Sequence, residues 1–113
     1  MLLVNHPMFQ GPGAGFVDDQ ILHESYWRMG PYLKEVTQRE VVDLDVTIPF
    51  AHRPISRYIN PLAAFDVLLV EMLELPPLEQ FIVDSIDVEL ERAIPRLLAM
   101  CFERRPALHP TGT

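Results

Sequence analysis

LAAFDVLLVEMLELPPLEQFIVDSIDVELE, residues 62–91, is the stretch on which the predicted fold depends. It carries eight acidic side chains and no lysine or arginine, and almost every other residue in it is apolar. The formal net charge of the whole chain is −7, so this stretch holds essentially all of it. A segment that is rich in apolar residues and carries charges of one sign only is expected to bury its apolar surface. Its negatively charged surface is expected to repel unsuitable partners.

Helical spacing of the apolar residues divides the stretch into two predicted helices. Asn60 followed by Pro61 is typical of a helix start, because the Asn side chain caps free amides and proline is favoured in the first turn. This predicts a helix over 61–75, which the pair Pro76-Pro77 ends. A second helix is predicted over 77–94. The two would form a helical hairpin.

The helical projection places a few apolar residues away from the main apolar stripe of each helix. At about 100° per residue, they form a small second apolar face that could contact another molecule. The alternative is that they are ordinary exposed apolar residues, which are common on protein surfaces. The four residues are Val67, Val70, Phe81 and Val88.

The rest of the chain predicts shorter elements. Residues 1–17 contain several glycines and prolines and are expected to form an extended arm. An Asp cap and helical spacing predict a helix over 19–29. Strict alternation of apolar and polar residues predicts a strand over 40–50, whose partner would be the arm near residues 2–5 or another chain. The sequence also predicts a last helix over 96–103, with a kink where it begins, and a polar tail over 104–113.

Together these elements predict an α+β fold that is mostly α. An extended N-terminal arm would lead into one small domain, residues 18–103, with a short helix, one or two strands and the C-terminal helical hairpin. The length of 113 residues allows one domain with a modest core. A hydrophobic fraction of 49% is high for a chain of this size, which suggests that some apolar residues meet a partner.

Charge and composition exclude several classes of function. A pI near 4.9 argues against direct nucleic-acid binding, which needs a basic surface. Apolar runs are too short for a membrane span, and the start lacks the pattern of a signal peptide, so a cytoplasmic protein is expected. The single cysteine, Cys101, lies in an apolar run and is interpreted as a buried residue.

Known chemical motifs are not matched, so no catalytic, cofactor-binding or metal-binding residue is predicted. Residues 11–15, GPGAG, lack the Gly-Lys-Ser/Thr ending of a phosphate-binding loop and do not open a helix. His23-Glu24 lacks the second histidine of a zinc-protease helix, because Trp27 stands in its place. Tyr26 and Trp27 are interpreted as a packing anchor or an interface hot spot. Arg53 and Arg57 could pair with the acidic stretch or with a neighbouring subunit.

The function that these features favour is a non-enzymatic structural or connector subunit of a large protein assembly. A virion component, such as a phage head or tail protein, is one setting. Its partners would be other protein subunits in a homo- or hetero-oligomer. Two alternatives stay open from the sequence: a small acidic binding or inhibitor protein that masks a basic surface, and an accessory subunit of a multi-subunit enzyme.

Overall fold

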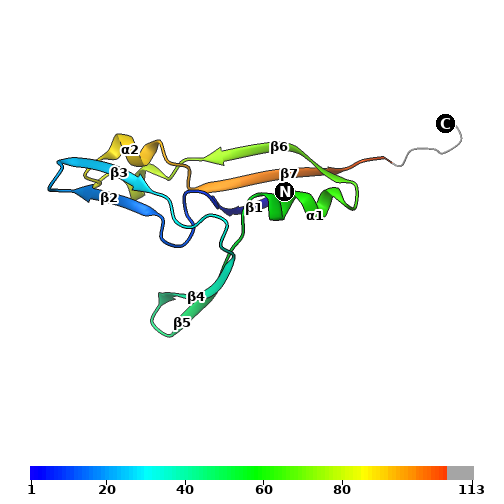
Figure 1. Cartoon of the computed structure of the whole chain (residues 1–113), viewed down its shortest axis with the longest axis horizontal. Coiled ribbons are helices and arrows are strands. Elements are labelled where there is room, and N and C mark those ends of the chain that lie inside the picture. Colours follow the sequence, from blue (N-terminus) through cyan, green and yellow to red (C-terminus); the bar gives the residue numbers. More distant parts are fainter. Residues whose placement is uncertain (107–113) are drawn as a thin grey trace, which may run out of the picture.

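A three-stranded antiparallel sheet forms the centre of the molecule. The computed structural model describes residues 1–106, with the backbone alone described at positions 40 and 42. The strand order is β1 (Leu2–Asn5), β7 (Leu97–Arg104), β6 (Val67–Leu75) (Figure 1). β7 is antiparallel to both neighbours, so β1 and β6 run in the same direction without pairing with each other.

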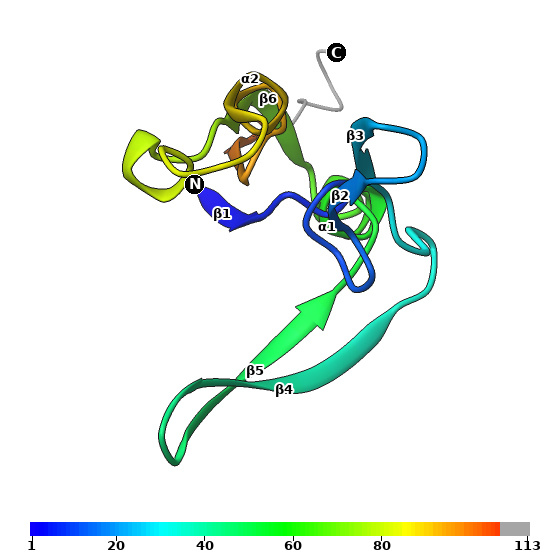
Figure 2. The same ribbon diagram turned by 90° about the vertical axis from the view of Figure 1, so that its left-hand side faces the viewer.

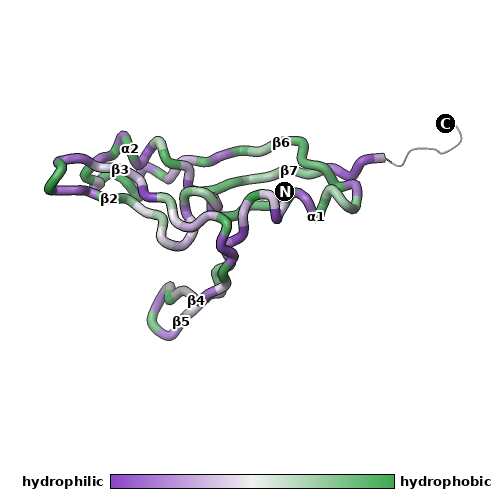
Figure 3. The backbone as a smooth tube through the Cα atoms, in the orientation of Figure 1, coloured by the Kyte–Doolittle hydropathy of each residue, from purple (hydrophilic) through white to green (hydrophobic). Residues whose placement is uncertain are grey.

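β7 is the buried strand of the sheet. Leu98 and Met100 have no exposed surface, and Ala99 between them is 2% exposed. A strand that is covered on both sides reads as a continuous apolar run rather than an alternating one, which is the pattern of residues 97–102. The hydropathy of β6 and β7 shows the same concentration of apolar residues in this part of the chain (Figure 3).

Two β-hairpins lie outside this sheet. β2 (Gly15–Asp19) pairs with β3 (Glu24–Arg28), and β4 (Val36–Asp43) pairs with β5 (Val46–His52). The β4–β5 hairpin projects away from the rest of the molecule in both views (Figures 1 and 2). A hairpin of two strands is marginally stable by itself, so its base has to be fixed by other residues.

Short helices complete the architecture. α1 (Ser56–Ala63) precedes β6 and packs beside it (Figure 1). The connection from β6 to β7 contains a 3-10 turn, η1 (Glu79–Phe81), and one short helix, α2 (Val88–Arg92), which contacts β3.

The predicted mostly helical fold is therefore wrong: the described part of the chain is mostly β, with antiparallel pairing. The predicted helix over 61–75 is the end of α1 followed by β6. Asp66, with a φ of 60°, stops α1, and Pro61 lies inside the helix rather than at its start. Residues 67–70 are a continuous apolar run, and such a run fits a buried strand as well as a helix face.

The other predicted C-terminal helices are also different. In place of a helix over 77–94 there are only η1 and α2, and residues 97–103 of the predicted helix over 96–103 belong to β7. Only the last part of the range 77–94 is helical, where Asp87 caps α2 by accepting a hydrogen bond from the Leu90 amide at 3.0 Å. No helical hairpin exists among residues 1–106, so the two-faced hairpin is not formed. Of the predicted tail, residues 107–113 lie outside the described residues.

The first predicted helix, 19–29, is the turn and second strand of the β2–β3 hairpin. Asp19 does accept hydrogen bonds from the amides of Ile21 and Leu22, both at 3.0 Å, but they close a turn instead of a helix. His23, with a φ of 54°, then leads the chain into β3. An Asp side chain makes the same contacts at a helix start and in a turn, so the sequence signal was ambiguous.

The predicted strand over 40–50 is two strands. The chain reverses near Asp45, which has a φ of 61°, so β4 and β5 pair with each other. The expected partner, residues 2–5, does form a strand, but it pairs with β7. Asp tolerates the left-handed conformation better than most residues, so the Asp-Leu-Asp sequence at 43–45 supports the turn.

Candidate functional site

The ends of β1 and β6 bring together two polar side chains, because both strands run in the same direction on either side of β7. His6 directly follows β1, and Glu74 lies near the end of β6. Nε2 of His6 and Oε2 of Glu74 are 2.7 Å apart. This pair is the centre of the candidate site.

The contacts of His6 indicate which tautomer its neutral ring adopts. The ring is 2% exposed, and its Nδ1 accepts a hydrogen bond from the Met8 amide at 3.3 Å. In the neutral ring the proton then lies on Nε2, which donates it to the Glu74 carboxylate. The Glu74 side chain is 51% exposed. His6 thus holds and orients a carboxylate that solvent and a ligand can reach.

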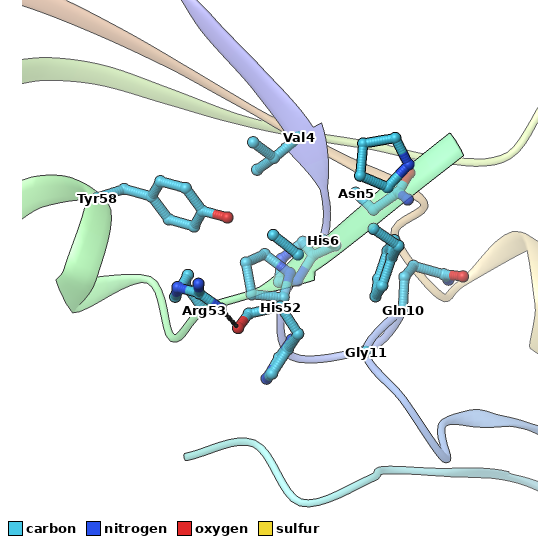
Figure 4. Close-up of a pocket in the computed structure, with 12 residues that line it drawn as sticks. Val4, Asn5, His6, Gln10, Gly11, His52, Arg53 and Tyr58 are labelled. Atoms are coloured by element: carbon cyan, nitrogen blue, oxygen red, sulfur yellow. Dashed lines mark hydrogen bonds between the residues drawn. The ribbon is translucent and has the colours of Figure 1, made fainter. Parts of the chain in front are cut away.

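Two cavities flank the pair. The His6 cavity, about 160 Å³, lies between the end of β1, the end of β5 and α1 (Figure 4). The Glu74 cavity, about 360 Å³, is lined by Glu74 and Arg92 and by four apolar residues, Phe9, Pro76, Ala93 and Pro95. Mostly apolar cavities with few polar groups are typical of small-molecule sites.

The segment after β1 is fixed by hydrogen bonds from other parts of the chain. The indole Nε1 of Trp27 donates to the Phe9 carbonyl at 2.8 Å, and the Gln10 side chain donates to the Pro95 carbonyl at 3.2 Å. Trp27 was predicted to be an anchor or an interface residue. The structure places it half-buried on β3, where it fastens the wall of the Glu74 cavity.

Arg53 and Tyr58 occupy the side of the His6 cavity next to α1. The Tyr58 side chain extends from α1 toward β1 (Figure 4). Partial burial raises the pKa of the Tyr58 hydroxyl, and the nearby Arg53 charge acts in the opposite direction. The hydroxyl is therefore a neutral hydrogen-bonding group at physiological pH.

The predicted partners of Arg53 and Arg57 are different in the structure. Arg53 donates to the carbonyls of Val36 and His52, at 3.1 and 2.8 Å, and so fastens the base of the β4–β5 hairpin. Arg57 pairs with Glu35 at 2.7 Å. Within the acidic stretch, Glu79 is paired with Arg92, and Asp66 with Arg105.

His52 closes the base of the same hairpin from inside. It is 3% exposed, and its Nε2 lies 2.8 Å from the carbonyl oxygen of Tyr32. The Tyr32 hydroxyl in turn accepts a hydrogen bond from the Ile55 amide at 2.7 Å. These contacts give His52 a structural role at the base of the hairpin, and its ring also lines the His6 cavity.

The first two residues of the glycine-rich segment 11–15 are packed against other parts of the chain. A Cβ at Gly11 would meet the His52 ring at 2.9 Å, and a Cβ at Gly30 would meet the Pro12 carbonyl oxygen at 1.9 Å. The segment continues into β2 rather than into a helix, so it has no helix N-terminus for a phosphate. These residues do not fit a nucleotide-binding loop.

The remaining predicted interface residues lie on four different elements. Tyr26 is on β3, Val67 and Val70 are on β6, Phe81 is in η1 and Val88 is in α2. Tyr26, Val70 and Phe81 are exposed, and the contact role predicted for all five stays a prediction. Among residues 1–106, no group of three His, Cys, Asp or Glu side chains could hold a metal ion. No helix in this range is long and apolar enough to cross a membrane.

Sequence reasoning missed both residues of the candidate site. It assigned His6 to an extended arm and Glu74 to the polar face of a helix. No motif spacing could have joined them, because 68 positions separate them along the chain. Only the pairing of β1 and β6 with β7 makes them neighbours.

No protein-family model and no curated protein matches this chain. A solved structure does match: the crystal structure of a "putative S-adenosylmethionine dependent methyltransferase" from Listeria monocytogenes. The TM-score is 0.65 at 20% sequence identity, over 92% of this chain. The match covers 46% of the Listeria chain, so this chain spans less than half of its length. At this identity the likeness shows the fold alone.

The likeness and the strand topology overturn the predicted function. A non-enzymatic connector or virion subunit was predicted from a helical hairpin that the chain does not form. The alternative of a small acidic protein that masks a basic surface assigned the acidic residues to the same predicted helices, which the described chain does not form. The prediction that the chain is not an enzyme is contradicted as well, by the resemblance of its fold to part of a protein described as a methyltransferase.

Proposed function

We propose that this chain forms the acceptor-substrate side of an S-adenosylmethionine-dependent methyltransferase. The observation that carries the proposal is the His6–Glu74 pair at the ends of β1 and β6, where it is flanked by the His6 cavity and the Glu74 cavity. The resemblance of the fold to part of a protein described as a methyltransferase supports the reaction class.

The chemistry of the pair suits an acceptor that carries a proton. Methyl transfer to an amine or a hydroxyl leaves a proton that a nearby base can take. Glu74 offers a half-exposed carboxylate, and the buried His6 keeps that carboxylate in one orientation. Fixed orientation matters because a reacting pair must be held within about 3–3.5 Å in the correct geometry.

The test is formation of S-adenosylhomocysteine by the protein isolated from its own source, with small amines, phenols and alcohols as acceptors. The Glu74→Gln variant keeps the size of the side chain and removes the base. We expect its rate to fall by about 10²-fold or more, in the range for loss of a general base. Glu103→Gln makes the same charge change on β7, away from the pair, and should keep the wild-type rate.

Two results would reject the proposal. One is the absence of S-adenosylhomocysteine formation by the wild-type protein with every acceptor class. The other is an equal rate for the Glu74→Gln and Glu103→Gln variants, because the carboxylate at the carboxyl end of β6 would then have no role in the reaction.

A further inference from the structure

The Glu74 cavity has an aromatic wall beside its carboxylate. The ring of Phe9 packs against the ring of His6, with a centroid distance of 5.1 Å and an interplanar angle of 51°. His6 in turn bonds to Glu74, and Phe9 and Glu74 line the same cavity. A ligand that reaches the carboxylate therefore lies next to the Phe9 ring. Such a position suits a flat aromatic ring, because aromatic rings pack favourably in offset or edge-to-face pairs.

The walls of this cavity are held in place by contacts behind them. The Trp27 indole bonds to the backbone of Phe9 at 2.8 Å, and the Gln10 side chain bonds to the Pro95 carbonyl at 3.2 Å. Pro76 and Pro95 add two further apolar walls with rigid rings. The volume of about 360 Å³ is near the lower end of the range for small-molecule sites. The cavity is therefore suited to a small ring compound.

Glu74 can accept a hydrogen bond from a ligand as well as from His6. A carboxylate has about four lone-pair sites, and His6 occupies one of them. The Glu74 side chain is 51% exposed, so a ligand can approach it. Arg92 also lines the cavity, but its guanidinium bonds to the carboxylate of Glu79 at 2.7 and 2.9 Å. Glu74 is thus the group of this cavity that can receive a proton from a ligand.

The presence of a base distinguishes between the possible acceptor groups. A neutral amine attacks through its lone pair and can release its proton after the methyl group has moved, whereas a hydroxyl becomes a strong nucleophile only as its proton leaves. A phenol, like tyrosine, has a pKa of about 10, whereas water has a pKa of about 15.7 and an aliphatic hydroxyl behaves similarly. A carboxylate base therefore assists a phenol more effectively than an aliphatic alcohol.

We propose that the Glu74 cavity binds a phenol whose hydroxyl is the methyl acceptor. This inference rests on the proposed function and names its substrate class. The ring lies against Phe9, and the hydroxyl donates a hydrogen bond to Glu74. The hydroxyl proton passes to a carboxylate oxygen of Glu74 as the phenol oxygen bonds to the methyl carbon of S-adenosylmethionine. The carbon–sulfur bond breaks and its electron pair stays on sulfur. The products are an aryl methyl ether, S-adenosylhomocysteine and a protonated Glu74.

Saturation-transfer NMR with the full chain measures the binding of two matched ligands, phenol and cyclohexanol. Both carry a hydroxyl on a ring of the same size, but only phenol is aromatic. We expect the wild-type chain to bind phenol at least about threefold more tightly. Phe9→Leu should remove this preference, whereas Phe65→Leu, at a 77% exposed position outside the cavity, should keep it. If Phe9→Leu does not fold, the wild-type comparison still tests the inference.

Three results would overturn the inference. They are equal binding of phenol and cyclohexanol by the wild-type chain, a preference for phenol that survives Phe9→Leu, and formation of S-adenosylhomocysteine with benzylamine or cyclohexanol but not with phenol. The last result would leave the proposed function standing. Phenol-selective binding without S-adenosylhomocysteine from any acceptor would reject the proposed function alone, because the binding readout does not require methyl transfer.

Discussion

The imidazole of His6 donates a hydrogen bond to the carboxylate of Glu74 at 2.7 Å, and thereby joins the end of β1 to the end of β6 across the buried strand β7. His6 is almost fully buried and Glu74 is half-exposed. The contact therefore contributes to folding through the histidine and can contribute to chemistry through the carboxylate. The two contributions can be separated by substitution.

Replacement of His6 by alanine should lower the free energy of unfolding by about 2–4 kcal/mol, because it leaves a cavity and removes two hydrogen bonds from a buried site. Urea denaturation of the full chain measures the loss. A double-mutant cycle with Glu74→Ala should give a coupling energy of about 1–2 kcal/mol. Additive effects of the two substitutions would show that the observed contact adds nothing to stability.

Gly30→Ala should destabilise the chain more than any other glycine substitution outside the left-handed region. The new Cβ would lie 1.9 Å from the carbonyl oxygen of Pro12, and backbone atoms cannot move aside as a flexible side chain can. Overpacking of this kind costs about 1–3 kcal/mol or more. At Gly15 a Cβ meets nothing within 4 Å, so Gly15→Ala is the matched control.

Thermal or urea denaturation of both variants tests this close approach. We expect Gly15→Ala to change stability by less than about 0.5 kcal/mol. Equal stability of the two variants would mean that the segment 11–15 and Gly30 are not packed together, and the argument against a nucleotide-binding loop in this segment would lose its support.

The sequence contains real local signals that have more than one structural meaning. Asp19 was interpreted as a helix cap, and it does accept two amides, but it closes the β2–β3 turn. The apolar run before Glu71 was assigned to a helix because its spacing fits a helix face, although a buried strand has the same appearance. Distant partners decided between these meanings: β6 and β1 both pair with β7.

The candidate site was harder to predict than the secondary structure. A histidine after a short apolar segment and a glutamate within an acidic stretch are each unremarkable in a sequence. Their proximity depends on β1 and β6 both ending at the same edge of the sheet. The high apolar content, in contrast, agrees with the many exposed large apolar side chains of the structure, among them Leu3 and Leu73.

The buried strand provides a test of the core. Leu98 has no exposed surface, so Leu98→Ala should lower the free energy of unfolding by about 2–5 kcal/mol. Leu44→Ala removes the same atoms from an 86% exposed side chain and should have an effect below about 0.5 kcal/mol. Chemical denaturation measures both. If Leu44→Ala cost as much as Leu98→Ala, the core would lie on the β4–β5 hairpin and not at β7.

The Glu79–Arg92 pair predicts a pH-dependent contribution to stability. A bidentate hydrogen bond from Arg92 holds the pKa of Glu79 below its ordinary value of 4.5, and it outweighs the smaller, opposing effect of desolvation. Because the folded-state pKa is lower than the unfolded value, the stabilisation is present above the unfolded pKa. It is lost as the pH falls through the lowered pKa of the folded state.

Carbon-13 NMR of the Glu79 carboxyl group measures this pKa. Arg92→Gln should raise it toward 4.5, whereas Arg105→Gln, which removes the partner of Asp66, should leave it unchanged. Added salt should raise the Glu79 pKa in the wild-type chain, because both side chains of the pair are exposed and their attraction is screened. An unshifted pKa in the wild-type chain would show that Arg92 does not hold Glu79 in solution.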